Sequence, residues 1–241
     1  MWFPPPTDLK LGPHEVHVWR ANLDLSAAQV EELAKTLSTD EKSRAGSFYF
    51  EQHRQRFIVG RGLLRTLLGR YLQIEPGQLQ FDYSPRGKPT LAGRSGAHPL
   101  QFNLSHCQGL ALYGFTCDRP IGIDLEYLRS SIEAETIAQR FFSAREYTAL
   151  IALPAQERQK GFFRAWTAKE AYLKATGEGL AGSLEQVEIS LIPGEPSRLL
   201  SIHGNSQAAV GWSLYDLTPA PDYIATLAVE GYGWNLSGWE C

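Results

Sequence analysis

The sequence predicts an α+β fold of two similar α+β subdomains related by a pseudo-two-fold axis, each with a long helix packed on a small antiparallel sheet. The chain has 241 residues, 43% of them hydrophobic, which is enough apolar material for one large or two small cores. A capping box, a long helix ending at a glycine and a set of short strands occur in this order twice. Glycine and proline separate the strands, as is typical of antiparallel hairpins.

In the first half, residues 14–23 ("HEVHVWRANL") alternate as a β-strand does. A serine N-cap begins a helix over residues 26–37. Ser38 and Glu41 have capping-box spacing, and the longer helix that follows ends near Gly69 or Tyr71. Short strands are then predicted in the segments "LQFDYS", "LQFNLS", "LALYGFT" and "IGIDLEYL".

The second half repeats this outline. Residues 132–142 read as a helix, and Ser143 and Glu146 again have capping-box spacing. A long helix follows over residues 156–175 and ends near Gly177. Strands are predicted in "QVEISLI", "LLSIHG", "AAVGWSLYDL" and "YIATLAV".

The two long helices can be aligned on their terminal glycines. Placing Gly69 against Gly177 also puts Arg61 against Lys169. This alignment is weak support for an internal repeat, because two unrelated helices with the same capping and terminating residues would align in the same way.

The halves join near Asp118–Pro120. We therefore expect an N-terminal subdomain over residues 1–118 and a C-terminal subdomain over residues 119–241. Two similar halves create a cleft between them, and clefts between domains are common ligand sites. The pairing also predicts a monomer, because the second half can supply what a partner subunit would.

Composition and charge exclude several classes of protein. The charged fraction is 20% and the net charge is −3, which does not indicate a nucleic-acid-binding or disordered chain. The start, "MWFPPPTDLK", does not have the pattern of a signal peptide, and no apolar run is long enough to span a membrane. Three cysteines without paired spacing favour a reducing cytoplasm.

Basic residues are concentrated in one part of the chain. Residues 41–70 contain seven Lys or Arg and two acidic residues. A local basic surface on a mildly acidic protein indicates an anionic ligand. For any single one of these residues, a solvated helix face is the simpler interpretation.

Two carboxylates stand two residues apart in the predicted strand "PIGIDLE". Side chains at positions i and i+2 of a strand share a face, so Asp124 and Glu126 lie side by side. Neighbouring carboxylates repel each other unless they are solvated or surround a cation. The pair alone is equally well explained as a solvated strand face.

A third carboxylate lies on the second long helix. Trp166, Glu170 and Lys174 follow at a spacing of four residues and share one side of it. If that side faces the cleft, Glu170 joins Asp124 and Glu126 in an all-oxygen site that suits Mg²⁺, or Mn²⁺, better than Zn²⁺. The alternative is an exposed Glu170–Lys174 ion pair worth about 0.3–0.5 kcal/mol.

Polar residues in two other segments could contact a phosphate. Ser105 and His106 are adjacent in "FNLSHC", so they point to opposite faces of a strand and do not form a catalytic triad. His106 either donates to a phosphate or is hydrogen-bonded in a strand corner. Lys88 stands in the predicted turn "RGKP", where lysines are usually solvated. The sequence contains neither a P-loop nor a G-x-G-x-x-G fingerprint.

Taken together, these segments resemble 4′-phosphopantetheinyl transferases of the larger, surfactin-synthetase-activating (Sfp-like) class. The matching stretches occur in family order and cover most of the chain from Asp40 to Leu180. The combination of "GIDLE" with "WTAKEAYLK" some forty residues later is the most specific part. The stretches are "EKSRAGSFYFEQHRQRFIVGRGLLR", "RGKP", "FNLSHC", "PIGIDLE", "AQRFFSAREY" and "FFRAWTAKEAYLKATGEGL".

The resemblance implies a reaction and a set of site residues. The family transfers 4′-phosphopantetheine from coenzyme A to a serine of an apo acyl or peptidyl carrier protein and releases 3′,5′-adenosine bisphosphate. It implies that Asp124, Glu126 and Glu170 bind Mg²⁺, that Lys174 contacts a phosphate oxygen, and that Glu170 deprotonates the serine. The resemblance also implies other contacts with coenzyme A. His106 and Arg44, with Arg56, would hold the 3′-phosphate. Lys88 and Pro89 would lie near the adenine, and Ser105 near the phosphates.

The chain departs from the family pattern at one place. Glu41 falls where the surfactin-synthetase activator has basic residues, so the contacts to the 3′-phosphate are left open. Two other functions also remain open on the residues alone. A Mg²⁺-dependent hydrolase of nucleotide pyrophosphates would use the same acids, and a non-catalytic module would bind coenzyme A or a carrier without turnover.

Overall fold

The computed structural model describes residues 2–93, 99–129, 132–179 and 184–241. Leu180, the end of the last family-like stretch, lies outside these residues. The first half contains β1 (Glu15–Asn22), α1 (Ala27–Ala34), α2 (Thr39–Gly46), α3 (Glu51–Leu72), the 3₁₀ turn η1 (Pro76–Gln78), β2 (Phe81–Tyr83), β3 (Pro89–Leu91), β4 (Leu100–Cys107) and β5 (Leu110–Cys117). The second half contains β6 (Ile121–Tyr127), α4 (Ala134–Phe141), α5 (Ala144–Ala152), α6 (Ala155–Thr176), η2 (Leu184–Gln186), β7 (Val187–Ile189), β8 (Leu199–Ile202), α7 (Ser206–Ala209), β9 (Trp212–Leu217), β10 (Tyr223–Glu230) and β11 (Asn235–Glu240).

The two halves repeat the same series of elements. Each begins with a strand, continues through two short helices, a long helix, a 3₁₀ turn and a two-stranded hairpin, and ends with a pair of longer strands. The main sheets also have matching antiparallel orders, β1-β5-β4 and β6-β10-β9. The predicted α+β fold of two similar halves, each with a long helix on a small antiparallel sheet, is confirmed.

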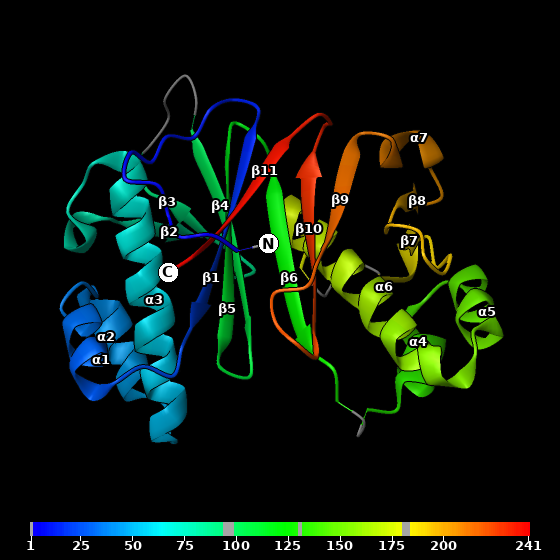
Figure 1. The fold of residues 1–241 in the computed structure, drawn as a ribbon, viewed down its shortest axis with the longest axis horizontal. Coiled ribbons are helices and arrows are strands. Elements are labelled where there is room, and N and C mark those ends of the chain that lie inside the picture. The colour runs from blue at the N-terminus through cyan, green and yellow to red at the C-terminus, as the bar shows by residue number, and fades with distance from the viewer. Residues whose placement is uncertain (1, 94–98, 130–131, 180–183) are drawn as a thin grey trace.

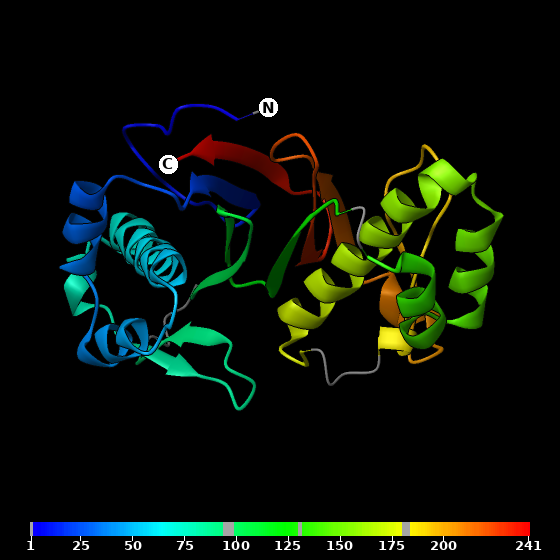
Figure 2. The same ribbon diagram turned by 90° about the horizontal axis from the view of Figure 1, so that it is seen from below.

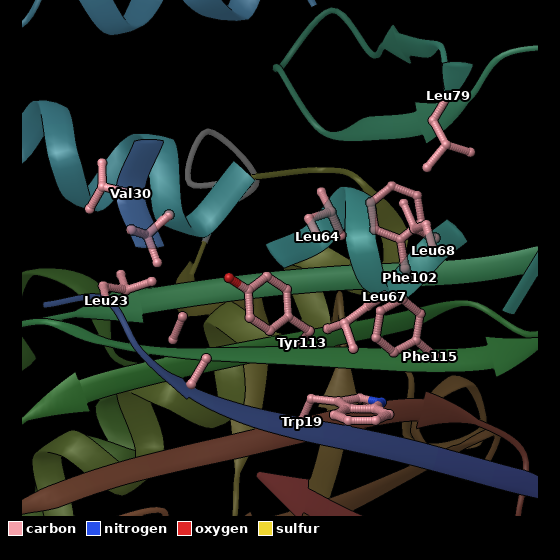
Figure 3. Packing of buried hydrophobic residues seen from close by; sticks show 13 residues of the cluster. Trp19, Leu23, Val30, Leu64, Leu67, Leu68, Leu79, Phe102, Tyr113 and Phe115 are labelled. Atoms are coloured by element: carbon pink, nitrogen blue, oxygen red, sulfur yellow. The ribbon is translucent and has the colours of Figure 1, made fainter. Parts of the chain in front are cut away.

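The two sheets lie back to back at the centre, and a long helix covers each outer face (Figures 1 and 2). Apolar residues of β1, β5, β6 and β10, among them Val18, Leu112, Ile123 and Leu227, form the core between the sheets. The core between α3 and the first sheet contains Trp19 together with aromatic and aliphatic side chains from β4, β5 and α3 (Figure 3). The second long helix packs on β6 and β10 in the same way.

The last strand crosses from the second half into the first sheet. β11 pairs in parallel with β1, so that residues 235–240 lie beside residues 15–20. The ring centroid of Trp239 in β11 lies 5.1 Å from that of Trp19 and 4.2 Å from that of His17. The boundary between residues 118 and 119 remains a prediction. The pairing of β11 with β1 joins the two halves across that boundary.

Helix ends follow the signals in the sequence. Ser26 caps α1, and the capping boxes at Ser38 and Ser143 are both present. Gly177 ends α6 in the left-handed conformation, with φ of 80°. The predicted strand "AAVGWSLYDL" begins instead with α7, because the Asn205 side chain accepts from two backbone N–H groups and caps a short helix there.

The internal repeat has a different register from the one predicted. The structure places Arg65, one helical turn after Arg61, at the position of Lys169 in the other long helix. Both cations are fully buried, and each bonds the capping-box glutamate of the preceding helix: Arg65 Nε donates to Glu41 at 2.6 Å, and Lys169 Nζ donates to Glu146 at 2.7 Å. The alignment on terminal glycines failed because α3 continues three residues beyond Gly69.

Among the residues that the structure describes, no helix combines the length and the apolar character needed to cross a membrane.

Candidate active site

The site forms where α6 lies directly against β6. Gly122 makes this approach possible, because a Cβ at this position would stand 2.0 Å from Ala171 O and 2.4 Å from Ala175 N. Only glycine fits between a helix backbone and a strand backbone at this distance. The same face of β6 carries Asp124 and Glu126, so the close contact brings α6 onto the two carboxylates.

A lysine, an aspartate and a serine form the centre of the site. Lys174 Nζ donates to Asp124 Oδ1 at 2.6 Å and to Ser105 Oγ at 3.0 Å. Ser105 Oγ also donates to Asp124 Oδ1, at 3.1 Å. Asp124 is 5% exposed and Ser105 7%, whereas about a quarter of the Lys174 side chain is accessible. The structure therefore brings together three of the predicted site residues, one each from β4, β6 and α6.

Glu170 completes this cluster as a buried carboxylate. It is 6% exposed, and among the residues that the structure describes, its buried Oε1 has no hydrogen-bond partner, nor has the buried Oδ2 of Asp124. Burial raises the pKa of Glu170 to about 7, and the negative charge of Asp124 adds to the shift, while Lys174 opposes it. The carboxyl group is thus held near the midpoint of its titration at neutral pH.

Glu126 lies at the more open edge of the cluster. Its side chain is 24% exposed, and burial, followed by the charge of Asp124, raises its pKa. The Cys107 thiol of β4 is 3.9 Å from Glu126 Oε2. Arg129 is 3.8 Å from the same oxygen and offsets part of the repulsion.

Asn103 aligns β4 with β6, and its role was missing from the sequence prediction. Its Oδ1 accepts from the backbone N–H of Ile123 at 2.9 Å, so a side chain of the first sheet bonds the edge strand of the second. This contact fixes the neighbouring Ser105 opposite Asp124. The alternation in "FNLSHC" indicates that Asn103 and Ser105 share a face, but not which strand they meet.

A basic side of the site comes from the first half. His106 follows Ser105 on β4, and its side chain is exposed. Partial desolvation lowers its pKa, and the positive charges of Lys174 and Arg56 add to this shift. Arg56 on α3 is held by Asp24, which accepts two hydrogen bonds of 2.7 Å from it. Arg44 is exposed on α2, with its guanidinium over the ring of Phe57. Its place beside a ligand remains a prediction.

Two of the remaining predicted residues have other contacts in the structure. Lys88 Nζ donates to the backbone carbonyls of Lys174 and Ala175 at the end of α6, and burial lowers its pKa to about 8. Pro89 begins β3. Glu41, which the family comparison places near the 3′-phosphate, is instead 2% exposed and ion-paired with Arg65.

The sequence alone gives Lys169 no firm role, and either solvation or a contact with an acidic carrier protein would fit it. The structure corrects both interpretations, because the side chain is completely buried. Besides Glu146, its ammonium donates to the carbonyls of Leu184, at 2.9 Å, and Val187. Lys169 therefore holds α6 on the helix and strand behind it and faces away from the cluster.

The acidic residues fit a hard cation in their chemistry. The described residues include no group of three or more His, Cys, Asp and Glu side chains arranged to hold a metal ion. However, within the described part of the chain Asp124 and Glu170 each have a buried oxygen without a hydrogen-bond partner, and the three carboxylates outnumber the two nearby cations, Lys174 and Arg129. Oxygen donors with excess negative charge are what Mg²⁺ and Mn²⁺ bind.

Fold and site together define a two-lobed α+β protein in which carboxylates and basic side chains meet where its two halves join. Residues 120–228 match the model of the 4′-phosphopantetheinyl transferase superfamily, and residues 22–113 match that of the N-terminal region of 4′-phosphopantetheinyl transferases. The chain belongs to the 4′-phosphopantetheinyl transferase superfamily.

Relatives that match between 65% and 99% of this chain are named 4′-phosphopantetheinyl transferases. The 4′-phosphopantetheinyl transferase HetI of Nostoc sp. is 52% identical over 99% of this chain and 98% of its own. The 4′-phosphopantetheinyl transferase Sfp of Bacillus subtilis is 31% identical over 86% of this chain and 84% of its own. The protein psf-1 of Bacillus pumilus is 35% identical over 65% and 64%. The predicted resemblance to Sfp-like transferases is confirmed, and the protein is an enzyme of this class.

Proposed function

We propose that the protein transfers 4′-phosphopantetheine from coenzyme A to a serine of an apo acyl or peptidyl carrier protein, with Mg²⁺ bound at Asp124, Glu126 and Glu170. The observation that carries the proposal is the pair of unpartnered buried oxygens on Asp124 and Glu170 beside the ammonium of Lys174. A cleft with this charge pattern suits a pyrophosphate and a cation together.

The reaction breaks one phosphorus–oxygen bond and forms another. The serine oxygen attacks the phosphorus that carries pantetheine, and 3′,5′-adenosine bisphosphate leaves with the electron pair of the broken anhydride bond. Bound Mg²⁺ would neutralise negative charge on the pyrophosphate. The ammonium of Lys174 would stabilise the same negative charge. Its hydrogen bonds to Asp124 and Ser105 hold it in place.

Glu170 is the proposed base. A serine hydroxyl is a weak nucleophile at neutral pH, so a carboxylate that accepts its proton helps the attack. Glu170 is suited to this role because burial places its pKa at about 7. Its position one helical turn before Lys174 lets α6 supply both the base and a cation.

The first half supplies the proposed contacts for the rest of coenzyme A. His106 and Arg56, with Arg44, would hold the 3′-phosphate, Ser105 would contact the phosphates, and the backbone at Lys88 and Pro89 would lie near the adenine. Lys174 and Arg56 are both close enough to His106 for their charges to lower its pKa, which supports their places around one part of the site. Because β4 and β6 belong to different halves of one chain, we also propose a monomer as the working unit, in the cytoplasm.

Intact mass spectrometry of a carrier protein tests the proposal. Incubation with apo carrier, coenzyme A and Mg²⁺ should add the mass of phosphopantetheine to the carrier. Asp124→Ala and Glu170→Ala should each lower turnover by roughly 10²-fold or more, and Lys174→Ala should also be severe. Glu178→Ala, just beyond the end of α6, is the control and should keep near-normal activity.

Three outcomes would contradict the proposal or the assignment of its site. No mass gain across fatty-acid, polyketide and peptide-synthetase carriers would exclude the transfer. Turnover of coenzyme A at the same rate without any acceptor protein would instead indicate a hydrolase. Near-normal activity in Asp124→Ala or Glu170→Ala would refute the site assignment.

A further inference from the structure

The side chain of Lys88 links the two halves at a point beside the carboxylate cluster. Its Nζ donates to Lys174 O at 2.6 Å and to Ala175 O at 3.0 Å, and it lies 3.5 Å from Ile121 O. These carbonyls mark the end of α6 and the beginning of β6. Three acceptors therefore surround an ammonium that has three protons to donate.

The end of α6 needs these donors. The last four carbonyls of an α-helix have no partner within the helix, and they carry the negative end of its dipole. In α6 the carbonyl of Leu173 accepts from Gly179 N at 3.3 Å, beyond the left-handed Gly177. The next two carbonyls, those of Lys174 and Ala175, receive the ammonium of Lys88.

The backbone around Lys88 is fixed before its side chain crosses to α6. Ser84 N donates to Lys88 O at 2.9 Å, and Lys88 N donates to Ser84 Oγ at 3.0 Å. Gly87 closes the turn with φ of 82°, a conformation that favours glycine. The β2–β3 hairpin thus presents Lys88 from a tight turn, and the teal hairpin in Figure 2 has its tip toward the end of α6.

A second side chain of the same turn contacts the same region. Arg86 lies against Gly179, where a Cβ would stand 3.4 Å from Arg86 Cδ. Two neighbouring residues of one hairpin in the first half therefore meet the residues that end α6. This end of α6 also carries Lys174, whose ammonium bonds Asp124.

We propose that Lys88 is a positioning residue that fastens the β2–β3 hairpin to the C-terminal end of α6 and keeps Lys174 aligned with Asp124. The inference deepens the proposed function, on which its kinetic part rests. The ammonium of Lys88 directs its three protons at backbone carbonyls of the protein and therefore does not contact coenzyme A. The backbone of the hairpin provides the proposed contact with coenzyme A.

The test compares Lys88→Met with Lys88→Arg, and with Lys160→Met as an exposed lysine control on the same helix. Hydrogen–deuterium exchange of the free protein should show faster exchange over residues 81–91 and 174–177 in Lys88→Met only. KM for coenzyme A should rise about tenfold, the effect of losing one net charge-assisted hydrogen bond. KM for the carrier should change by less than about twofold, because no hydrogen bond near the carrier is removed. Lys88→Arg should restore KM for coenzyme A to near its wild-type value.

Three outcomes would count against the proposal, and a fourth would count against the proposed function alone. Unchanged exchange at the hairpin and the helix end would overturn it. Loss of coenzyme A affinity in both variants with unchanged exchange would mean that the ammonium contacts the substrate instead. If Lys88→Met does not fold, Lys88→Gln replaces it and should show intermediate exchange, and wild-type exchange there would reject the link. Altered exchange in an enzyme that transfers nothing would contradict the proposed function while supporting the link.

Discussion

Glu170 combines burial with nearby negative charge, and both disfavour its ionised form. The side chain is 6% exposed, and Asp124 and Glu126 both raise its pKa beyond the effect of burial. Lys174 offsets only part of this, because its ammonium bonds Asp124. The ionised cluster is therefore costly in the free protein, and a bound cation would relieve that cost.

The first prediction concerns the stability of the metal-free protein. The pKa of Glu170 is about 7 when folded against an ordinary 4.5, so the folded state keeps a proton that the unfolded state has lost between these pH values. Stability from this group is complete below about pH 4.5 and falls as pH rises to about 7, by roughly 3 kcal/mol. Glu170→Gln lacks this titration, so its stability relative to the wild type should rise over the same interval and then stay level.

Urea unfolding between pH 4.5 and 8 in the presence of a chelator measures the effect. Added Mg²⁺ at pH 8 should stabilise the wild type more than Glu170→Gln. A constant stability difference across the whole pH range would show that Glu170 is not perturbed by its surroundings.

Glu170 and its neighbour Lys169 show what sequence reasoning could resolve. The spacing of Glu170 and Lys174 and the pair in "GIDLE" predict the cluster only together with the family motifs around them. Lys169 was left without a role, because nothing in its local sequence indicates that Glu146 and two distant carbonyls surround it. The burial of a charge depends on partners far along the chain.

The contact between α6 and β6 depends on the space at a single residue of the strand. A Cβ at Gly122 would stand 2.0 Å from Ala171 O, so Gly122→Ala must push α6 away from β6. We expect a loss of about 3 kcal/mol or more in the free energy of unfolding and nearly complete loss of transfer activity. Denaturant unfolding and the carrier assay measure both effects.

Gly46→Ala is the matched control for this substitution. Gly46 ends α2, and a Cβ there would have no atom within 4 Å. Alanine at this position should be neutral or slightly stabilising, since it lowers the entropy of the unfolded chain. Equal stability of the two variants would contradict the close approach of α6 to β6.

The buried cations of the two long helices lead to a third prediction. Lys169→Met would leave Glu146 buried without its positive partner, which typically costs 3–5 kcal/mol. Lys160→Met on the exposed side of the same helix should change stability by less than about 0.5 kcal/mol. Thermal or urea unfolding compares the two, and a similar small effect in both would show that the buried pair contributes little.

At the level of elements, local signals predicted most of the helices and strands. Both capping boxes and the glycine end of α6 are local, and the structure contains all three. β11 was not predicted, because "NLSGWE" becomes a strand only through its pairing with β1, more than two hundred residues away. β3 is short and follows a turn, so its sequence has too few residues to show an alternating pattern.

The repeat explains why the ion pair between a long helix and the first strand of its half is described in the second half and replaced in the first. Trp19 pairs with the fourth residue of β5, and Asp124 pairs with the fourth residue of β10, so the two are equivalent. Arg70 and Lys174 are likewise the third-last residues of their long helices. The Lys174–Asp124 ion pair thus corresponds to Arg70 lying 5.2 Å above the ring of Trp19.

The last strand extends the first sheet at the edge formed by β1. There, β11 pairs with β1 and stacks Trp239 near Trp19. The equivalent strand of the second half, β6, has β4 beside it, which supplies Ser105 and Asn103 to the carboxylate cluster. The two halves are therefore joined at two different junctions, one at the carboxylate cluster and one where β11 meets β1.

These junctions lead to the last prediction, that the two halves unfold as one unit. The core between the sheets is built from strands of both halves, and β11 of the second half completes the first sheet. Trp239→Ala in β11 and Trp212→Ala in β9 remove aromatic contacts on opposite sides of the molecule. Each should cost about 2 kcal/mol and lower a single shared Tm by about 4–8 °C, with far- and near-ultraviolet circular dichroism changing together. Two separate transitions, of which each variant shifts only one, would mean that the halves are independent domains.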